Sequence, residues 1–305
     1  MTISLPRCPD CGGSTRLLGP IPAADAFAGR ALERPLAGGF LYRCVQCSLG
    51  FRWPRLSKAE LDVLYSQGSE TAWSAQARSR PDWRIARSWI QAMVPLGGLI
   101  LDVGCFEGSF LQPLVGAYRC SGIEIHPVAC NRAREKGIEI IGNDFSSVRG
   151  HFDCITAFDV IEHVARPKSL LVNCLAALKP GGWLLFSSGN LDSSTFRWMG
   201  SRYWYCAIAE HLSFVSPSWF SRLGDELGFR IMNYAVFAHH DASWLTRIRE
   251  AASNVLYRTM PAAFHALRSS GVGRRNAKSF PELAEYPPSW ISARDHFIVL
   301  LQKHD

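Results

Sequence analysis

The chain has 305 residues, of which 48% are hydrophobic and 19% charged, and a formal net charge of +7. This composition is typical of an ordered globular protein and excludes a largely disordered chain. No apolar run approaches the roughly eighteen residues that a spanning helix needs, and the N-terminus lacks a signal-peptide pattern, so we expect a soluble cytoplasmic protein.

Two Cys-x-x-Cys pairs open the chain, Cys8 with Cys11 and Cys44 with Cys47. Each pair can occupy two corners of a tetrahedral Zn²⁺ site, and glycine and proline beside the cysteines favour the turns this requires. The spacing therefore predicts a structural zinc module over residues 1–56, with no open position for chemistry at the metal. Between the pairs, abundant Pro, Gly and Ala predict a loop with one short strand at 40–42.

The remaining six cysteines stand singly, mostly among apolar neighbours. Free cysteine behaves as a small buried hydrophobic residue, so these thiols need no function and fit a reducing compartment. They are Cys105, Cys120, Cys130, Cys154, Cys174 and Cys206.

Two helices are predicted to link the cysteine module to the rest of the chain, over residues 57–95. Ser57 followed by Glu60 is a capping box, which indicates a helix starting at Ser57. The apolar spacing over residues 81–94 predicts the second helix.

From residue 99 onward, short apolar runs alternate with helical patterns. The runs at 99–103, 120–125, 139–141, 152–158 and 182–187 predict buried strands, and those at 229–238 and 296–301 a closing antiparallel pair. Such alternation indicates an α/β domain over 96–305 with a doubly wound, mostly parallel sheet. Ligands bind beyond the carboxyl ends of the strands in such sheets, so the site is expected there.

A glycine loop follows the first of these strands, where Asp102, Gly104 and Gly108 precede a helix predicted to open at Ser109. The glycines permit a tight turn and a close approach of ligand to backbone. Glu124 ends the second strand about twenty residues after the first glycine, where a carboxylate can bind both hydroxyls of a ribose. The loop departs from the dinucleotide pattern Gly-x-Gly-x-x-Gly, which weakens an NAD interpretation and leaves an adenosine moiety.

The segments LDVGCFEGSF, GIEI, GND, FDVIEHV and LKPGGWLLFS, in this order over residues 99–190, resemble the class I S-adenosylmethionine-dependent methyltransferases. The resemblance implies a Rossmann-like seven-stranded sheet and S-adenosylmethionine as cofactor. The sequence departs from the family pattern at Phe106, where many members carry glycine. Carried over by position, the implied cofactor-binding residues are Asp102, Gly104, Cys105, Phe106, Gly108, Glu124, Asp144 and Asp159.

The two cysteine pairs followed by FRWPRLSKAELDVLY resemble a narrower subgroup with an N-terminal zinc module. Several of its members methylate sugars in antibiotic or surface-polysaccharide pathways. We therefore expect a small-molecule or glycan-linked acceptor, namely a nucleotide-linked sugar or a surface-polysaccharide precursor.

A general base is needed only if the acceptor is a hydroxyl or an acidic carbon, because the methyl group arrives already activated on a sulfonium. The predicted catalytic residues are His211, His163 and Tyr203, with Tyr205 and Glu210 as further candidates. His163 could instead cap a helix, and His211 could anchor a substrate loop. Four tryptophans of this region could stack on a sugar or simply fill the core: Trp183, Trp198, Trp204 and Trp219.

Residues 242–291 are predicted to interrupt the last two strands. Within 242–281, seven arginines and lysines stand against Glu250 alone, so most of the excess charge is local. An apolar stripe from Trp244 to Leu256 predicts a helix with arginines on its other side, followed by a flexible basic loop at 269–275. The helix could pack on the domain with solvated arginines, cover a phosphate-bearing substrate, or contact an anionic membrane surface.

Two other functions are compatible with parts of this pattern. Zinc modules also precede some RNA methyltransferases, but the confined basic charge and the lack of an Asn-Pro-Pro-Tyr-like loop at Phe158 argue against nucleic acid. A non-catalytic, zinc-stapled scaffold is the second, and the intact Asp102, Gly104 and Glu124 argue against it.

Overall fold

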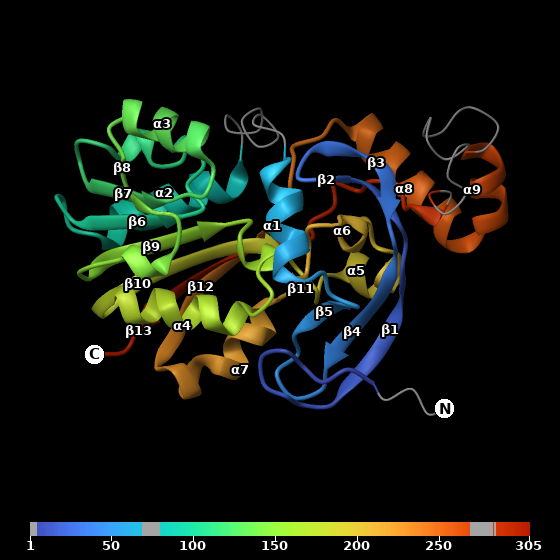
Figure 1. Cartoon of the computed structure of the whole chain (residues 1–305), viewed down its shortest axis with the longest axis horizontal. Helices are drawn as coiled ribbons and strands as arrows, with labels where there is room; N and C mark the ends of the chain where they lie inside the picture. The colour runs from blue at the N-terminus through green and yellow to red at the C-terminus, as the bar shows by residue number, and fades with distance from the viewer. Residues whose placement is uncertain (1–4, 69–79, 269–282, 284) are drawn as a thin grey trace.

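The computed structural model describes residues 5–68, 80–268, 283 and 285–305. Its centre is a seven-stranded sheet in the order β12-β13-β10-β9-β6-β7-β8 (Figure 1). Only β13 runs antiparallel to its neighbours within this sheet, so the predicted doubly wound, mostly parallel architecture is confirmed. The strands are β6 (Leu99–Val103), β7 (Arg119–Ile123), β8 (Glu139–Gly142), β9 (Phe152–Phe158), β10 (Leu178–Gly189), β12 (Phe229–Phe237) and β13 (His296–Lys303).

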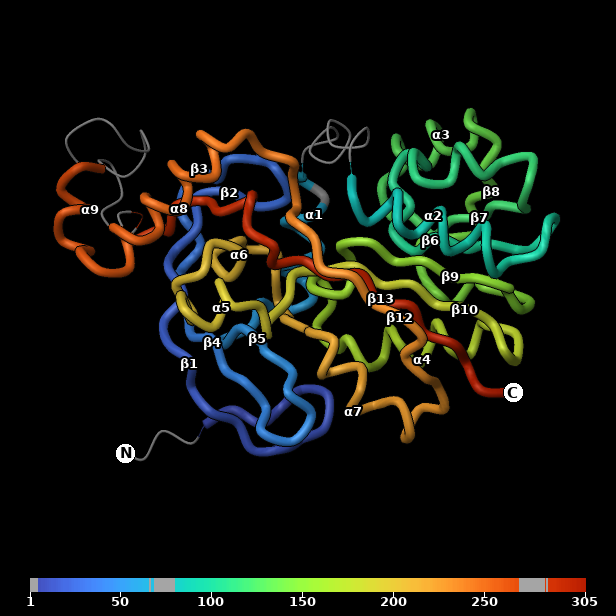
Figure 2. Tube along the Cα trace, turned by 180° about the vertical axis from the view of Figure 1, so that it is seen from behind, coloured from blue at the N-terminus to red at the C-terminus, as the bar shows by residue number. Residues whose placement is uncertain are grey.

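Helices cover both faces of the sheet, as the two opposite views show (Figure 2). On one face α4 (Pro167–Ala177) and α7 (Pro217–Leu227) bury side chains such as Leu171 and Trp219. On the other, α2 (Pro81–Met93) and α3 (Pro127–Glu135) do so with residues such as Ile90. The helix predicted over 81–94 is therefore confirmed.

The helix predicted to open at Ser109 is wrong. The chain forms turns there and then a short 3₁₀ helix, η2 (Gln112–Leu114). Pro113 lacks the N–H that a continuing helix needs, and Gly116 adopts the left-handed φ of +93° that ends it. The glycine loop consequently has no α-helix N-terminus to attract negative charge.

The N-terminal module is more regular than the loop we predicted between the cysteine pairs. It consists of β1 (Thr15–Ile21), β2 (Ala24–Phe27), β3 (Arg30–Leu36), β4 (Gly39–Cys44) and β5 (Gly50–Trp53). Abundant Pro, Gly and Ala do not prevent these short strands, since each is an edge strand or pairs antiparallel with one neighbour or two. The capping box of Ser57 and Glu60 is confirmed at the start of α1 (Lys58–Ser66).

The module is joined to the part of the chain that forms the seven-stranded sheet by strand pairing and side-chain bonds. β5 pairs with the two-residue β11 (Ser213–Phe214), which extends the module's sheet. The buried Arg52 donates to the carbonyl oxygens of Cys206, Ile208 and His211. Cys8, Cys44 and Cys47 also pack in the same core cluster as α4 and α7.

Two helical segments are added at the carboxyl side of the strands. Residues after β10 form α5 (Ser194–Met199), the 3₁₀ helix η5 (Gly200–Arg202) and α6 (Trp204–Ala207). Between β12 and β13, α8 (Trp244–Thr259) and α9 (Pro261–Leu267) extend to the end of the molecule away from α3 (Figure 1). No helix in the described ranges is long and apolar enough to cross a membrane.

Most of the predicted stripe on α8 does not pack on the domain. Trp244, Ile248 and Val255 are 67%, 57% and 46% exposed. The inward face instead carries Asn254 and Tyr257, with Leu256 partly buried beside them. Of the three alternatives for this helix, packing of the whole stripe on the domain is therefore contradicted, and the other two stay predictions. The basic loop predicted at 269–275 lies outside the described residues.

Candidate active site

A cavity of about 790 Å³ lies at the carboxyl ends of β6, β7 and β9. The glycine loop and the end of β9 form one part of its wall, and residues after β10 and β12 form another. The N-terminal module contributes Gly29, from the turn between β2 and β3, and the helix α1 that follows the module contributes Tyr65. The site therefore combines side chains from both ends of the chain.

The glycine loop presents backbone to the cavity. Gly104 has φ +71°, and a Cβ atom there would come within 2.7 Å of Val160. Phe106 lines the cavity with φ +47°, in the left-handed region that glycine favours. This conformation explains why glycine suits that position, and a phenylalanine held there carries backbone strain of about 1–2 kcal/mol.

Two carboxylates flank the loop. The side chain of Glu124 accepts the backbone N–H of Phe106 at 2.9 Å and of His126 at 2.7 Å. Asp102 accepts the hydroxyl of Thr156 at 2.6 Å, and burial raises its pKa to about 7 despite that bond. Both residues line the cavity, and each carboxylate oxygen keeps a lone pair for a ligand.

Two of the predicted cofactor residues lie outside the cavity wall. Gly108 packs against Ile138, where an added Cβ would come within 2.1 Å of the side chain. Asp144 is exposed and accepts the backbone N–H of Ser146 at 2.8 Å, capping the 3₁₀ helix η3 (Phe145–Ser147). The other six, including Cys105 and Asp159, line the cavity.

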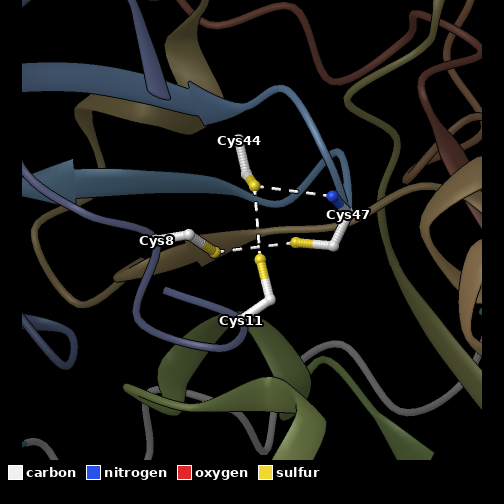
Figure 3. Close-up of side chains that lie close together, drawn as sticks. All are labelled: Cys8, Cys11, Cys44 and Cys47. Carbon is white, nitrogen blue, oxygen red and sulfur yellow. Dashed lines mark hydrogen bonds between the residues drawn. The ribbon is translucent and has the colours of Figure 1, made fainter. Parts of the chain in front are cut away.

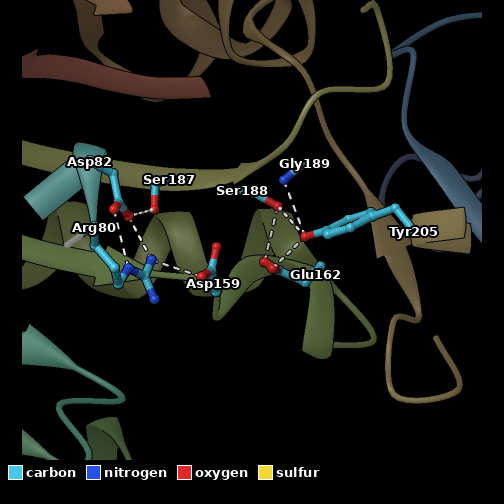
Figure 4. Close-up of polar contacts among 8 residues, drawn as sticks. All are labelled: Arg80, Asp82, Asp159, Glu162, Ser187, Ser188, Gly189 and Tyr205. Carbon is cyan, nitrogen blue, oxygen red and sulfur yellow. Dashed lines mark hydrogen bonds and ion pairs between the residues drawn. The ribbon is translucent and has the colours of Figure 1, made fainter. Parts of the chain in front are cut away.

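An arginine-centred network that sequence reasoning missed holds the end of β9 (Figure 4). Arg80 lies 2.7 Å from Asp159 and 2.6 Å from Asp82, and Asp82 accepts the hydroxyl of Ser187 at 2.8 Å. Burial raises the pKa of Asp159, but the charge of Arg80 outweighs it and keeps that carboxyl ionised. Arg80 follows a segment without periodicity, so no local signal pointed to it.

His163 and His211 are brought together in the cavity wall, with ring centroids 5.0 Å apart. Nδ1 of His211 lies 3.0 Å from the carbonyl oxygen of Tyr205, and Nδ1 of His163 lies 3.2 Å from the hydroxyl of Tyr65. Burial lowers the pKa of both imidazoles, which favours their neutral forms. His163 lies in the 3₁₀ helix η4 (Ile161–His163), ahead of α4, and therefore does not cap it.

Tyr205, rather than Tyr203, reaches the cavity. Its hydroxyl donates to Glu162 at 2.6 Å, and the hydroxyl of Ser188 donates to the same carboxylate at 3.0 Å (Figure 4). Glu162 is buried, and burial raises its pKa. Tyr203 is not among the cavity-lining residues; it packs against Phe196 and Trp204 instead.

Three further histidines, missed in the sequence, line the cavity: His239, His240 and, at the start of β13, His296. Nδ1 of His296 lies 2.7 Å from Asp295, and both side chains are almost fully buried. Nε2 of His296 has no hydrogen-bond partner among the described residues. His296 pairs with Gly189 and Phe237 across the sheet, which brings it to the site although it is the last of these residues in the chain.

Among the four tryptophans considered, only Trp204 lines the cavity. Trp219 is fully buried in the core, and Trp198 is partly exposed and lies edge-to-face against Trp290. Trp183 packs beside the cluster under α2. Core filling therefore accounts for most of this set.

The four N-terminal cysteines converge (Figure 3). The Sγ atoms of Cys8 and Cys47 lie 3.6 Å apart, those of Cys11 and Cys44 lie 3.5 Å apart, and all four are within 4.8 Å of one another. Sulfur atoms around a tetrahedral zinc ion are separated by about 3.8 Å. The donor set and spacing therefore fit a closed four-thiolate site. The six other cysteines are all buried.

Comparison with known proteins agrees with this geometry. Residues 77–234 match the methyltransferase domain family. The ubiquinone biosynthesis O-methyltransferase of Thiobacillus denitrificans is 27% identical over 187 residues, which cover 55% of this chain and 80% of that protein. The Coxiella burnetii enzyme of the same name is 26% identical over 210 residues, 61% of this chain and 87% of that protein.

Among solved structures, one chain of the complex between the Haloferax volcanii Trm112 methyltransferase activator and a methyltransferase aligns with a TM-score of 0.50 and 15% identity. The alignment covers 78% of this chain and 98% of that one, and it supports the fold. The family match spans more than half of the chain and includes the glycine loop and both carboxylates. The chain belongs to the methyltransferase domain family and is an S-adenosylmethionine-dependent methyltransferase.

Proposed function

We propose that the enzyme methylates a hydroxyl group of a small, hydroxyl-rich acceptor, such as a nucleotide-linked sugar or a surface-polysaccharide precursor. The proposal depends mainly on the polar wall of the cavity beyond the glycine loop. That wall carries His163, His211 and Glu210 beside Trp204, with His239 and His240 nearby. Hydrogen-bonding groups and one aromatic face suit a sugar better than an apolar molecule.

S-adenosylmethionine supplies a methyl group on a positively charged sulfur. In our proposal Glu124 binds the ribose hydroxyls with its free lone pairs, while Asp102 and the backbone at Gly104 bind the methionine part. Cys105, Phe106 and Asp159 line the same end of the cavity and complete the set. The size of the cavity admits an acceptor beside such a ligand.

His211 is the proposed general base. Its Nδ1 faces a backbone carbonyl, so Nδ1 carries the proton and Nε2 has the free lone pair. Burial keeps the imidazole neutral, which is the form that accepts a proton from a hydroxyl. His163, beside it, would orient the same hydroxyl.

His296 is the proposed counterpart of His211, a hydrogen-bond donor to a second oxygen of the acceptor. Burial lowers its pKa, but the carboxylate of Asp295 outweighs this and raises the pKa above its ordinary value. Two histidines in one cavity whose pKa values move in opposite directions suggest a base and an acid. His296, held by Asp295, would donate from Nε2.

Cys8, Cys11, Cys44 and Cys47 are proposed to hold a structural zinc ion. A closed set of four thiolates leaves no coordination position for a substrate, so this site would stabilise the fold. The knuckles contact the methyltransferase domain directly, since Arg222 donates to the carbonyl oxygen of Gln46 at 3.0 Å.

A phenolic acceptor is the second candidate, favoured by the similarity to ubiquinone biosynthesis O-methyltransferases. A phenol also needs a base near the methyl group. The two candidates differ in whether the acceptor presents a hydroxyl-rich or an apolar body to the histidine-lined wall.

The cofactor site is tested by calorimetric titration of the zinc-loaded protein with S-adenosylhomocysteine. We expect micromolar binding by the wild type and a loss of at least about tenfold in Glu124→Gln, because one ribose acceptor oxygen is lost. Glu135→Gln, an exposed acid at the end of α3, is the matched control. Full-strength binding by Glu124→Gln would remove Glu124 from the site.

The base is tested by S-adenosylhomocysteine release from a panel of nucleotide-linked hexoses and a catechol. His211→Asn should lower kcat by about 10²–10⁴-fold, with the exposed His151→Asn as control. Activity should persist below pH 6.5, because His211 stays neutral there, and should fall as pH rises through the raised pKa of His296. His296→Asn should abolish that alkaline fall; an unchanged profile would exclude His296 as donor.

A further inference from the structure

α8 is attached to the rest of the protein by its polar side. Glu250 accepts the backbone N–H of Ser292 at 3.0 Å, and the amide of Asn254 donates to the carbonyl oxygen of Ser289 at 3.2 Å. One turn further on, the hydroxyl of Tyr257 donates to the carbonyl oxygen of Glu285 at 2.8 Å. The inward face of this helix is therefore held by hydrogen bonds and one aromatic ring.

The apolar side of α8 faces away from the protein. Trp244, Leu245, Ile248 and Val255 recur at helical spacing and form a single row, which we call the α8 stripe. Each is between 46% and 67% exposed among the described residues. A surface helix normally buries such a row, so its exposure marks a binding surface.

Positive charge borders the α8 stripe on both sides. At 100° per residue, Arg247 and Arg258 lie along one edge of the stripe and Arg249 along the other. All three are exposed, whereas Glu250 points inward to Ser292. An apolar row that starts with tryptophan and is bordered by arginines is typical of helices that lie in the interface of an anionic bilayer.

We propose that the α8 stripe docks on a membrane surface that contains anionic lipids. The helix would lie parallel to the bilayer, with Trp244 and Ile248 at the boundary between headgroups and acyl chains. Its arginines would contact lipid phosphates. A second copy of the chain is a poorer occupant, because a symmetric contact through this face would bring the arginines of both copies together.

Docking through α8 would also bring the active site close to the membrane surface. α8 begins shortly after His240, and Glu250 bonds to Ser292, the neighbour of Ile291. Both His240 and Ile291 line the cavity. Docking of α8 on the membrane would thus hold the cavity wall near acceptors that are themselves anchored in the membrane.

The test is flotation of the full-length, zinc-loaded protein with vesicles of phosphatidylcholine, alone or with one third phosphatidylglycerol. We expect binding to the anionic vesicles that weakens with added sodium chloride. Arg247→Gln with Arg249→Gln should reduce that binding about thirtyfold, the effect of two arginines near an anionic surface. Leu245→Gln with Ile248→Gln should reduce it at least as much.

Leu96→Gln is the matched control, because Leu96 is 83% exposed and lies far from α8 in the chain. All variants should keep S-adenosylhomocysteine binding, which shows that they fold. Equal binding to neutral and anionic vesicles, or variants that bind like the wild type, would overturn the proposal. Self-association in sedimentation velocity that Ile248→Gln abolishes would assign the stripe to a second copy instead.

Discussion

The cysteine module and α8 are both additions to the same seven-stranded sheet, yet they face it in opposite ways. In the module, the side chains of Leu41, Leu49 and Phe51 are fully buried. In α8 the side chains of Trp244 and Ile248 point outward, and the helix faces the protein with hydrogen-bonding groups and the ring of Tyr257. One addition extends the core, and the other presents an apolar surface.

This difference affects how each addition relates to the active site. The module reaches the cavity through Gly29 and supports its wall through Arg52, whose three carbonyl partners are Cys206, Ile208 and His211. α8 is linked to the cavity wall through the bond of Glu250 to Ser292, the neighbour of the lining residue Ile291. Changes in the module should therefore disturb the fold and the site together, whereas changes on the α8 stripe should spare both.

The largest effect is expected for Cys44→Ser. Zinc ligation in small modules contributes on the order of 10 kcal/mol, so loss of one thiolate should lower the free energy of unfolding by roughly 5 kcal/mol or more. Thermal unfolding and zinc content of the purified protein measure this. Cys174→Ser, at a buried thiol away from the cluster, should keep its zinc. Equal losses in the two variants, with no zinc in the wild type, would contradict the metal site.

An intermediate effect is expected for Arg52→Gln. The carbonyl oxygens of Cys206 and His211 would lose the donor that Arg52 provides, and that of Ile208 would keep only the backbone N–H of His211. At about 1 kcal/mol for each lost hydrogen bond, the unfolding free energy should fall by about 3 kcal/mol. Because one of those carbonyls belongs to His211 itself, kcat should fall as well. Denaturant titration and the methyl-transfer assay measure the two effects. Arg16→Gln, an exposed residue of β1, should change neither; similar behaviour of both variants would mean that the module does not support the site.

The smallest effect is expected for Ile248→Ala. Its side chain is exposed, so the unfolding free energy should change by less than about 0.5 kcal/mol. Leu49→Ala is the paired variant in the module; its side chain is fully buried, and we expect a loss of about 2–5 kcal/mol. Denaturant titration of the two variants measures this difference, which distinguishes a side chain of the core from one on an exposed docking face. A large loss in Ile248→Ala would mean that the α8 stripe is part of the core.

Local patterns predicted most of the central sheet. The run 152–158 and the helix at 81–94 appear where their apolar spacing indicated. Local patterns failed at Ser109 and between the cysteine pairs. Pro113 and Gly116 prevent the α-helix predicted to open at Ser109. Antiparallel pairing forms strands from a segment whose composition resembles a loop.

The sequence by itself determined the groups whose function is encoded at short range: the cysteine spacing, the glycine loop and Glu124 after its strand. Tertiary structure alone decided the rest of the site. Asp295 and His296 reach the cavity through strand pairing with β10 and β12, and Tyr205 reaches it while Tyr203 does not. Tertiary structure also decided which face of α8 packs against the protein. Helical periodicity states which side chains share a face, but which face is buried depends on the surface available to pack against it.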